Sequence, residues 1–173
     1  MSGRHLAWAG AATAAVILLS AMAWGLAHPA SVASDSVLGR PAPDVVVRGL
    51  DGGQATLSGL RGRPVVLNFW ASWCAPCRQE EGPLRTAAQR LDGRVGFLGV
   101  DFRDTPDAAR IAQQRAGYPY VVGPADGGIP AAYGVTEPPE TFFIDQRGVV
   151  VARFLGPLDT DLIHRYLQLV GVT

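Results

Sequence analysis

Two apolar runs in the middle of the chain are each followed by a stretch with helical character. Residues Val65–Trp70 and 95–100 are almost continuously apolar, which is typical of strands buried on both faces of a sheet. The stretches 74–91 and 159–170 place apolar residues along one helical face. The stretch 104–117 opens with Asp104-Thr105-Pro106 and closes with Gly117, the usual start and end signals of a helix.

A hairpin is predicted on each side of this alternation. Segments 45–47 and 55–57 enclose a glycine-rich turn, and segments 141–145 and 149–154 enclose the turn 146–148. The predicted order is hairpin, β-α-β-α-β, hairpin, α. For the last strand of the β-α-β-α-β unit, the pattern identifies no particular segment. This order indicates an α/β fold with a mixed central sheet covered by helices on both faces.

The N-terminal part of the chain differs in composition from the rest. An uncharged apolar run covers residues 6–27, and as a helix it would be about 33 Å long, close to the ~30 Å hydrocarbon core of a bilayer. Arg4 precedes the run and no Lys or Arg follows before Arg40, so the positive-inside tendency places the rest of the chain outside the cytoplasm. We expect a transmembrane signal-anchor over 1–28, a linker over 29–40 and one folded domain over 41–173.

A cleaved signal peptide is the alternative for the N-terminal segment. Ser31-Val32-Ala33 offers small residues for cleavage, but the apolar run is longer than the usual h-region of about 7–15 residues. Both interpretations export the domain to the periplasm or to the outer face of the membrane, where disulfides persist.

Composition narrows the chemistry. The formal net charge is zero, which gives no indication of a nucleic-acid partner. All 15 basic residues are arginine, so a mechanism that needs a lysine nucleophile is excluded. Nothing in the sequence requires an assembly larger than a monomer.

Cys74 and Cys77 are the only cysteines, and they lie between a predicted strand and a predicted helix. Residues three apart on a helix lie about 5–6 Å from each other, a separation that suits a disulfide. A zinc site needs about four ligands, and no second cysteine pair exists. A purely structural disulfide is a weak alternative, because so short a loop restrains the unfolded chain little. The order strand, Cys-X-X-Cys, helix therefore favours a redox-active pair.

Three segments resemble the thioredoxin superfamily, and within it the membrane-tethered thiol-disulfide oxidoreductases of the TlpA/ResA/CcmG (DsbE) type. The resemblance implies a thioredoxin-like fold with an added N-terminal β-hairpin. The segments are Gly39-Arg40-Pro41-Ala42-Pro43-Asp44 with 57–64, the active-site run Phe69-Trp70-Ala71-Ser72-Trp73-Cys74-Ala75-Pro76-Cys77, and Tyr133-Gly134-Val135 with Pro139-Glu140-Thr141-Phe142-Phe143-Ile144-Asp145.

In such proteins the cysteine pair is the only redox centre, so no other cofactor and no metal is expected. Cys74 should lie at the N-terminal end of its helix, where backbone N–H groups and the helix dipole favour a thiolate. The first cysteine of such pairs is usually the exposed one, so we predict that Cys74 attacks the substrate and Cys77 resolves the mixed disulfide. Ala75 and Pro76 separate the thiols and are expected to tune the redox potential.

Resolution by Cys77 requires a base. Ordinary thioredoxins carry an Asp where this chain has Asn68, and an amide cannot accept the proton. The resemblance implies that Glu80 takes this role, since i, i+3 spacing places it on the same helix side as Cys77. We expect Glu80 to be partly buried with a raised pKa; the alternative is a solvated acid in the first helical turn, which is the interpretation kept for Glu81.

The substrate is expected to contact residues from two segments. Pro139 matches the cis-proline that faces the thiols in the family, and Pro138, which lacks an N–H, offers a substrate strand only its carbonyl. The alternative is a rigid Pro-Pro loop. Glu140 is expected to add negative charge near the thiols and to bias partner choice, or else to be an ordinary exposed residue. Trp73 is a candidate partner contact, whereas Trp70 is expected in the core.

The resemblance implies a reductase for the cysteine pairs of apocytochrome c or of its handling proteins. Electrons would come from a membrane carrier of the CcdA/DsbD kind. One alternative is a general reductase or oxidant of other exported proteins. Another is a Sco-like copper protein, but the spacing is Cys-X-X-Cys and His164 lies in the closing helix. An AhpC/TSA peroxidase shares the N-terminal hairpin pattern but needs a Pro-X-X-X-Thr-X-X-Cys motif, which is absent.

Overall fold

A computed structural model divides the chain into two units, Met1–Asp35 and Ser36–Thr173. The residues that it describes are Trp8, Thr13, 15–20, Met22, Trp24, 37–125 and 127–173. Those of the first unit are helical. Among the described residues, no helix combines the length and the hydrophobicity of a membrane span. The anchor predicted over 1–28 and the linker predicted over 29–40 fall mostly outside the described residues.

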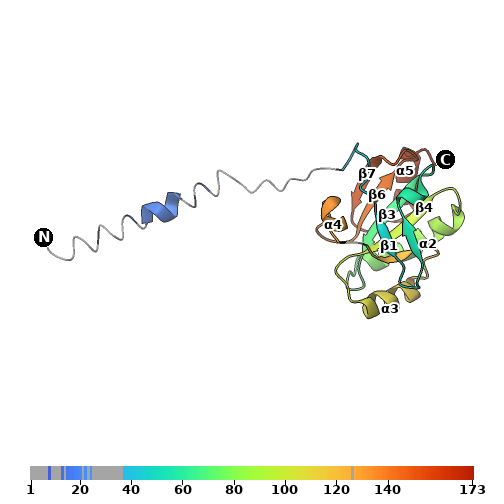
Figure 1. The fold of residues 1–173 in the computed structure, drawn as a ribbon, viewed down its shortest axis with the longest axis horizontal. Helices are drawn as coiled ribbons and strands as arrows, with labels where there is room; N and C mark the ends of the chain where they lie inside the picture. The colour runs from blue at the N-terminus through green and yellow to red at the C-terminus, as the bar shows by residue number, and fades with distance from the viewer. Residues whose placement is uncertain are drawn as a thin grey trace. The chain divides into compact units, whose positions relative to one another are not determined.

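The second unit is built on a five-stranded sheet with the order β5-β4-β3-β6-β7 (Figure 1). The strands are β3 (Val65–Trp70), β4 (Gly96–Asp101), β5 (Val122–Pro124), β6 (Glu140–Ile144) and β7 (Val150–Leu155). Strands β3, β4 and β5 are parallel, whereas β6 and β7 run antiparallel to their neighbours. The predicted mixed sheet is therefore confirmed, with the apolar strand β3 at its centre.

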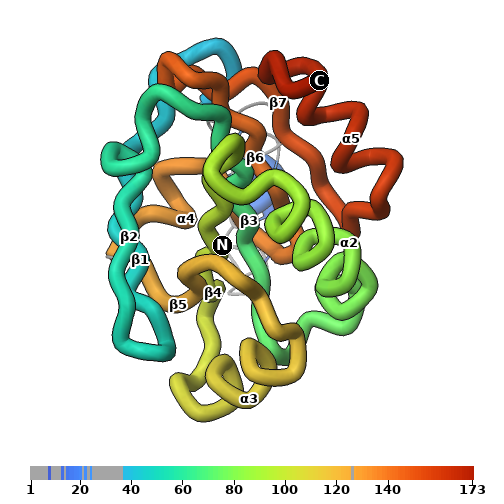
Figure 2. The backbone as a smooth tube through the Cα atoms, turned by 90° about the vertical axis from the view of Figure 1, so that its right-hand side faces the viewer, coloured from blue at the N-terminus to red at the C-terminus, as the bar shows by residue number. Residues whose placement is uncertain are grey.

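Helices and a separate hairpin cover this sheet. The remaining elements are β1 (Val46–Arg48), β2 (Gln54–Thr56), the 3-10 helix η1 (Ser58–Leu60), α2 (Cys77–Arg90), α3 (Pro106–Ala116), α4 (Ile129–Ala132) and α5 (Thr160–Leu169). Figure 2 shows the β1–β2 hairpin on one side of β3 and β4, and α2 with α5 on the other. The prediction of helices on both faces needs refinement, because the hairpin and the short α4 take the second face.

Side-chain alternation along β3 explains these two layers. Val66 packs with Leu84 of α2 and Ile163 of α5, whereas Leu67 and Phe69 pack beneath the hairpin. All six residues of β3 are buried, as expected for a strand covered on both faces.

The strand that the sequence pattern did not locate is β5, which has only three residues, Val-Gly-Pro. So short a segment shows no periodicity, and its position depends on the hairpin next to it. Leu50 N–H donates to the carbonyl of Val122 at 3.0 Å. A Cβ built on Gly123 would lie 2.0 Å from the carbonyl oxygen of Arg48. Only a glycine therefore lets β5 approach the end of β1 this closely.

We expect Gly123→Ala to destabilise the fold by about 1–3 kcal/mol, because backbone atoms must shift to admit the methyl group. Chemical denaturation measures the change. The matched control is Gly127→Ala, whose Cβ meets nothing within 4 Å and which should leave stability nearly unchanged or slightly raised. Equal stabilities of the two variants would contradict the close approach of β1 and β5.

Candidate active site

The Cys-X-X-Cys segment forms the turn that joins β3 to α2. The two cysteines form a disulfide with Cα atoms 5.4 Å apart, so the structure represents the oxidised pair. The helix begins at Cys77. The prediction that it begins at Cys74 is wrong, because residues 72–76 are needed to turn the chain from the strand into the helix.

Cys74 nevertheless receives the field of the helix end. The backbone N–H of Cys77, the first residue of α2, donates a hydrogen bond to Cys74 Sγ at 3.1 Å. This N–H belongs to the helix turn whose donors have no partner within the helix. A negative charge on Cys74 sulfur would therefore be stabilised by this N–H and by the helix dipole.

Exposure does not distinguish the two sulfurs. Cys74 and Cys77 are each only 3% exposed. The expectation that Cys74 is the exposed cysteine is therefore wrong for the oxidised protein. Trp70 and Ala71, together with Ala109 and Ala112 of α3, form one buried cluster with the two cysteines. The assignment of Cys74 as nucleophile depends instead on its place before the helix.

Glu80 is completely buried in the first turn of α2. Its carboxylate accepts a hydrogen bond from Asn68 Nδ2 at 2.8 Å and one from the backbone N–H of Leu158 at 3.0 Å. Burial raises the pKa of Glu80 to about 7, although both hydrogen bonds oppose the rise. The neighbouring Glu81 is partly buried, and its carboxylate pairs with Arg115 at 2.6 Å. Glu80 and Glu81 are adjacent in the sequence but have different environments in the structure.

Asn68 connects this acid to the central sheet. Its side-chain amide donates to Thr141 Oγ1 at 3.0 Å as well as to Glu80. Asn68 and Thr141 are register partners on β3 and β6. The amide of Asn68 thus orients the carboxyl group of Glu80. It cannot itself accept a proton in place of that carboxyl group.

The loop before β6 contains a cis peptide bond between Pro138 and Pro139. Both prolines are buried, and the carbonyl of Pro139 accepts the N–H of Gly156 at 2.9 Å. A role of this loop in substrate binding stays a prediction.

Glu140 differs from its expected state. It is 1% exposed and forms an ion pair with Arg153 of β7. Burial raises its pKa, and Arg153 opposes that rise. The expectation of a free negative charge near the thiols is therefore corrected, because the guanidinium of Arg153 neutralises the carboxylate from the neighbouring strand.

A loop after β4 holds the turn before Cys74, and sequence reasoning missed it. The carboxylate of Asp104 accepts hydrogen bonds from the backbone N–H and the hydroxyl of Ser72. Trp73 is 52% exposed, and its indole N–H donates to the carbonyl of Arg103 at 3.3 Å. Asp104 had shown only a helix-start signal in the sequence, because its contact with Ser72 exists only in the folded chain.

Asp101 was missed as well. It ends β4 and is the register partner of Trp70. Burial, together with the charge of Asp104, raises the pKa of Asp101 to about 7. One carboxylate oxygen of Asp101 and the indole N–H of Trp70 are buried without a protein hydrogen-bond partner. Among the described residues, no group of three or more His, Cys, Asp or Glu side chains is placed to hold a metal ion.

The sheet order and a dithiol pair in the turn before a helix define a thioredoxin-like protein of thiol-disulfide exchange. The comparisons with known proteins agree. The AhpC/TSA family matches residues 38–153, so the chain belongs to that family. Relatives of this chain are named thiol:disulfide interchange proteins.

Three relatives show this. A thiol:disulfide interchange protein DsbE homolog of Paracoccus denitrificans is 40% identical over 76% of this chain and 74% of the relative. DsbE of Xylella fastidiosa is 33% identical over 90% of this chain and 82% of the relative. The crystal structure of a DsbE candidate from Chlorobium tepidum has a TM-score of 0.69, 28% identity, and coverage of 78% of this chain and 98% of that chain. The chain is accordingly a thiol-disulfide oxidoreductase.

The raised pKa of Glu80 predicts how stability depends on pH. Between about pH 4.5 and 7 the folded chain keeps a proton on Glu80 that the unfolded chain has lost, so stability falls as pH rises through this window. The loss attributable to Glu80 is up to about 3 kcal/mol. Glu80→Gln should flatten the curve of unfolding free energy against pH, measured by urea denaturation of the oxidised protein.

Asp101→Asn offers a matched comparison, because burial raises the pKa of Asp101 to about 7 as well. Asp101→Asn should also reduce the fall of unfolding free energy with rising pH, independently of Glu80→Gln. If Glu80→Gln keeps the full slope of the natural sequence, Glu80 does not carry a raised pKa.

Proposed function

We propose that this chain is an exported, membrane-tethered reductase of disulfides in apocytochrome c or in the proteins that handle it. The observation that carries the proposal is the Cys74–Cys77 pair, whose first sulfur accepts the N–H of the first residue of α2. Relatives named as DsbE thiol:disulfide interchange proteins support the exchange chemistry. Export is supported by the uncharged run over 6–27 and by the absence of Lys and Arg between Arg4 and Arg40.

In the proposed reaction the thiolate of Cys74 attacks one sulfur of the substrate disulfide. The substrate S–S bond breaks, a mixed disulfide forms, and the leaving sulfur takes up a proton. The thiol of Cys77 then loses its proton and attacks Cys74 Sγ, which releases the second substrate sulfur. Two electrons have passed to the substrate, and the protein is left with the Cys74–Cys77 disulfide.

Glu80 is the proposed acceptor of the Cys77 proton. It lies one turn along α2 from Cys77, and i, i+3 spacing places both side chains on the same side of the helix. A pKa of about 7 is well suited to a group that must take up and release a proton near neutral pH. No cofactor other than the cysteine pair is required.

The proposed substrate site lies between Trp73 and the cis-proline loop. Trp73 offers an exposed aromatic surface next to Cys74. Pro138 has no N–H, so a substrate strand can pair only with its carbonyl. After each turnover a membrane electron carrier of the CcdA/DsbD kind would reduce the disulfide again. Ala75 and Pro76, which lie between the thiols, are proposed to tune the potential at which this occurs.

A trapping experiment tests the nucleophile and the client together. Cys77→Ser expressed in its native membrane should accumulate covalent complexes through Cys74, because the resolving thiol is gone. Non-reducing electrophoresis and mass spectrometry would detect the complexes and identify the client, for which we expect apocytochrome c or one of its handling proteins. Capture of many unrelated exported proteins would favour a general reductase.

Cys74→Ser is the matched control and should trap nothing. Complexes in this variant but none in Cys77→Ser would reverse the assignment. A redox titration gives the direction of electron flow. A reduction potential close to that of DsbA, about −120 mV, would indicate an oxidant rather than a reductase.

A further inference from the structure

Arg103, in the loop after β4, has an unusual backbone conformation. Its φ is 52°, and it is the only residue other than glycine with a positive φ in the part of the chain that the structure describes. Residues with a Cβ rarely adopt this region. A conformation of this kind persists where surrounding contacts hold it, often at a functional site.

The contacts that hold the loop come from the turn before Cys74. The indole of Trp73 donates to the carbonyl of Arg103 at 3.3 Å, and the hydroxyl of Ser72 donates to Asp104 Oδ1 at 2.8 Å. The N–H of Phe102 donates to the carbonyl of Trp70 at 2.8 Å. Arg103 is therefore fixed beside the exposed indole that precedes the reactive cysteine.

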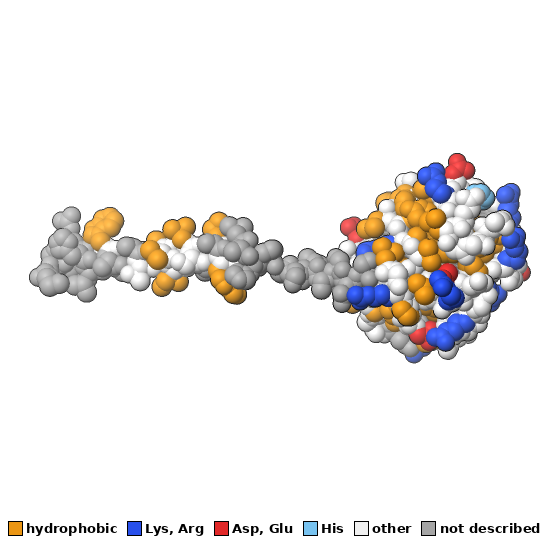
Figure 3. Space-filling model, turned by 90° about the horizontal axis from the view of Figure 1, so that it is seen from above, with side chains coloured by type: hydrophobic (Ala, Val, Ile, Leu, Met, Phe, Trp, Pro, Cys, Tyr) orange, Lys and Arg blue, Asp and Glu red, His pale blue; other side chains and the backbone are white. Residues whose placement is uncertain are grey.

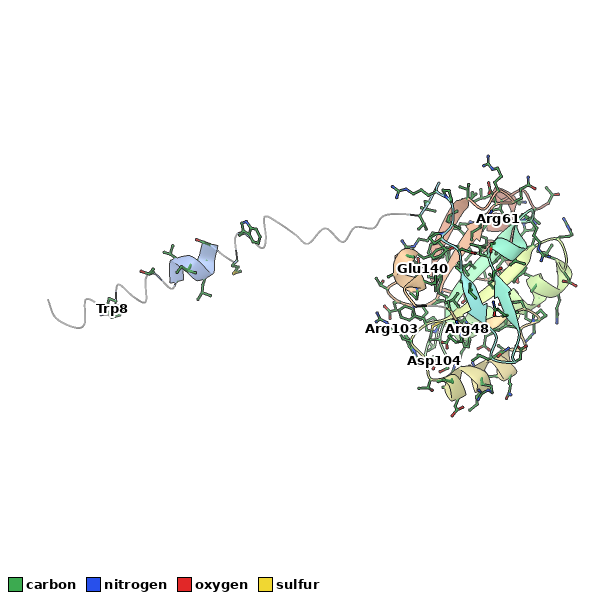
Figure 4. All side chains as sticks on the ribbon, in the orientation of Figure 1. Trp8, Arg48, Arg61, Arg103, Asp104 and Glu140 are labelled. Atoms are coloured by element: carbon green, nitrogen blue, oxygen red, sulfur yellow. A yellow bond between two sulfur atoms is a disulfide. The ribbon has the colours of Figure 1, made fainter. Side chains whose placement is uncertain are left out.

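The guanidinium of Arg103 is exposed and available. Its central carbon lies 4.9 Å from the centre of the Phe102 ring, and no ion pair joins it to another described residue. Asp104 is the next residue (Figure 4), but both of its carboxylate oxygens accept hydrogen bonds from Ser72. Four other arginines differ in being paired with carboxylates: Arg110, Arg115, Arg147 and Arg153.

We infer that Trp73 and Arg103 form a contact surface that selects protein substrates with an acidic side chain next to the reacting disulfide. The inference rests on the proposed function and adds a rule of substrate choice to it. The indole covers the apolar part of the substrate segment, and the planar guanidinium suits bidentate binding of a carboxylate. Figure 3 shows basic side chains at several separate places on the visible face.

Two other exposed charges are close to the site along the chain. Arg78 follows Cys77 in α2, and Glu137 precedes the cis-proline pair. Arg78 is a second possible source of a preference for acidic substrates, whereas Glu137 would oppose it. A test must therefore separate Arg103 from Arg78.

The test compares two disulfide-bridged Cys-X-X-Cys peptides that differ only in the residues flanking the bridge, Glu in one and Gln in the other. The full chain is reduced, freed of reductant and mixed with each peptide, and tryptophan fluorescence follows its oxidation. We expect the Glu peptide to react about threefold faster at low ionic strength, as for an exposed ion pair. The ratio should approach one in high salt.

Arg103→Asn should abolish the preference, since asparagine tolerates positive φ and carries no charge. Arg103→Lys should retain much of it, and Arg78→Gln should leave it intact. Equal rates for the two peptides with the natural sequence, a preference that survives Arg103→Asn, or one that disappears in Arg78→Gln would each overturn the inference. Failure to reduce both peptides and insulin would instead refute the proposed function.

Discussion

The hydrogen bond from the N–H of Cys77 to the sulfur of Cys74 is the contact on which the chemistry depends. It places one sulfur outside the helix, facing the N-terminal donors, and the other inside the first turn. Two chemically identical thiols thereby acquire different environments. The buried strand β3 makes this possible, because layers on both faces fix the point at which the chain leaves the sheet and turns into α2.

The environment of Glu80, three residues after Cys77, disfavours the charged form of its side chain. A carboxyl group with no exposed surface is costly to ionise, and the two hydrogen bonds from Asn68 and Leu158 compensate only part of that cost. The site therefore holds Glu80 near the point at which it gains and loses a proton. The folded chain therefore loses stability as the pH rises toward neutrality and Glu80 ionises.

Segments far apart in the sequence hold the loops of this domain in place. The loop after β4 holds the turn at Ser72 and Trp73, and the cis-proline loop is tied to Gly156 through the carbonyl of Pro139. The two loops differ electrostatically. Glu140 is neutralised by Arg153, whereas Arg103 presents an unpaired charge. Partner selection is therefore expected to depend more on the Arg103 side of the disulfide than on Glu140.

The sequence by itself determined the main elements and the reacting pair. Continuous apolar runs identified β3 and β4, capping signals identified α3, and cysteine spacing identified the disulfide, because each of these depends on residues close together in the chain. Tertiary structure decided the rest. The burial of Cys74, the ion pair of Glu140, the position of β5 and the contact of Asp104 with Ser72 all depend on groups brought together from distant segments. Local patterns carry no information about which surface another segment will cover, and burial is what changes the charge and the pKa of a side chain.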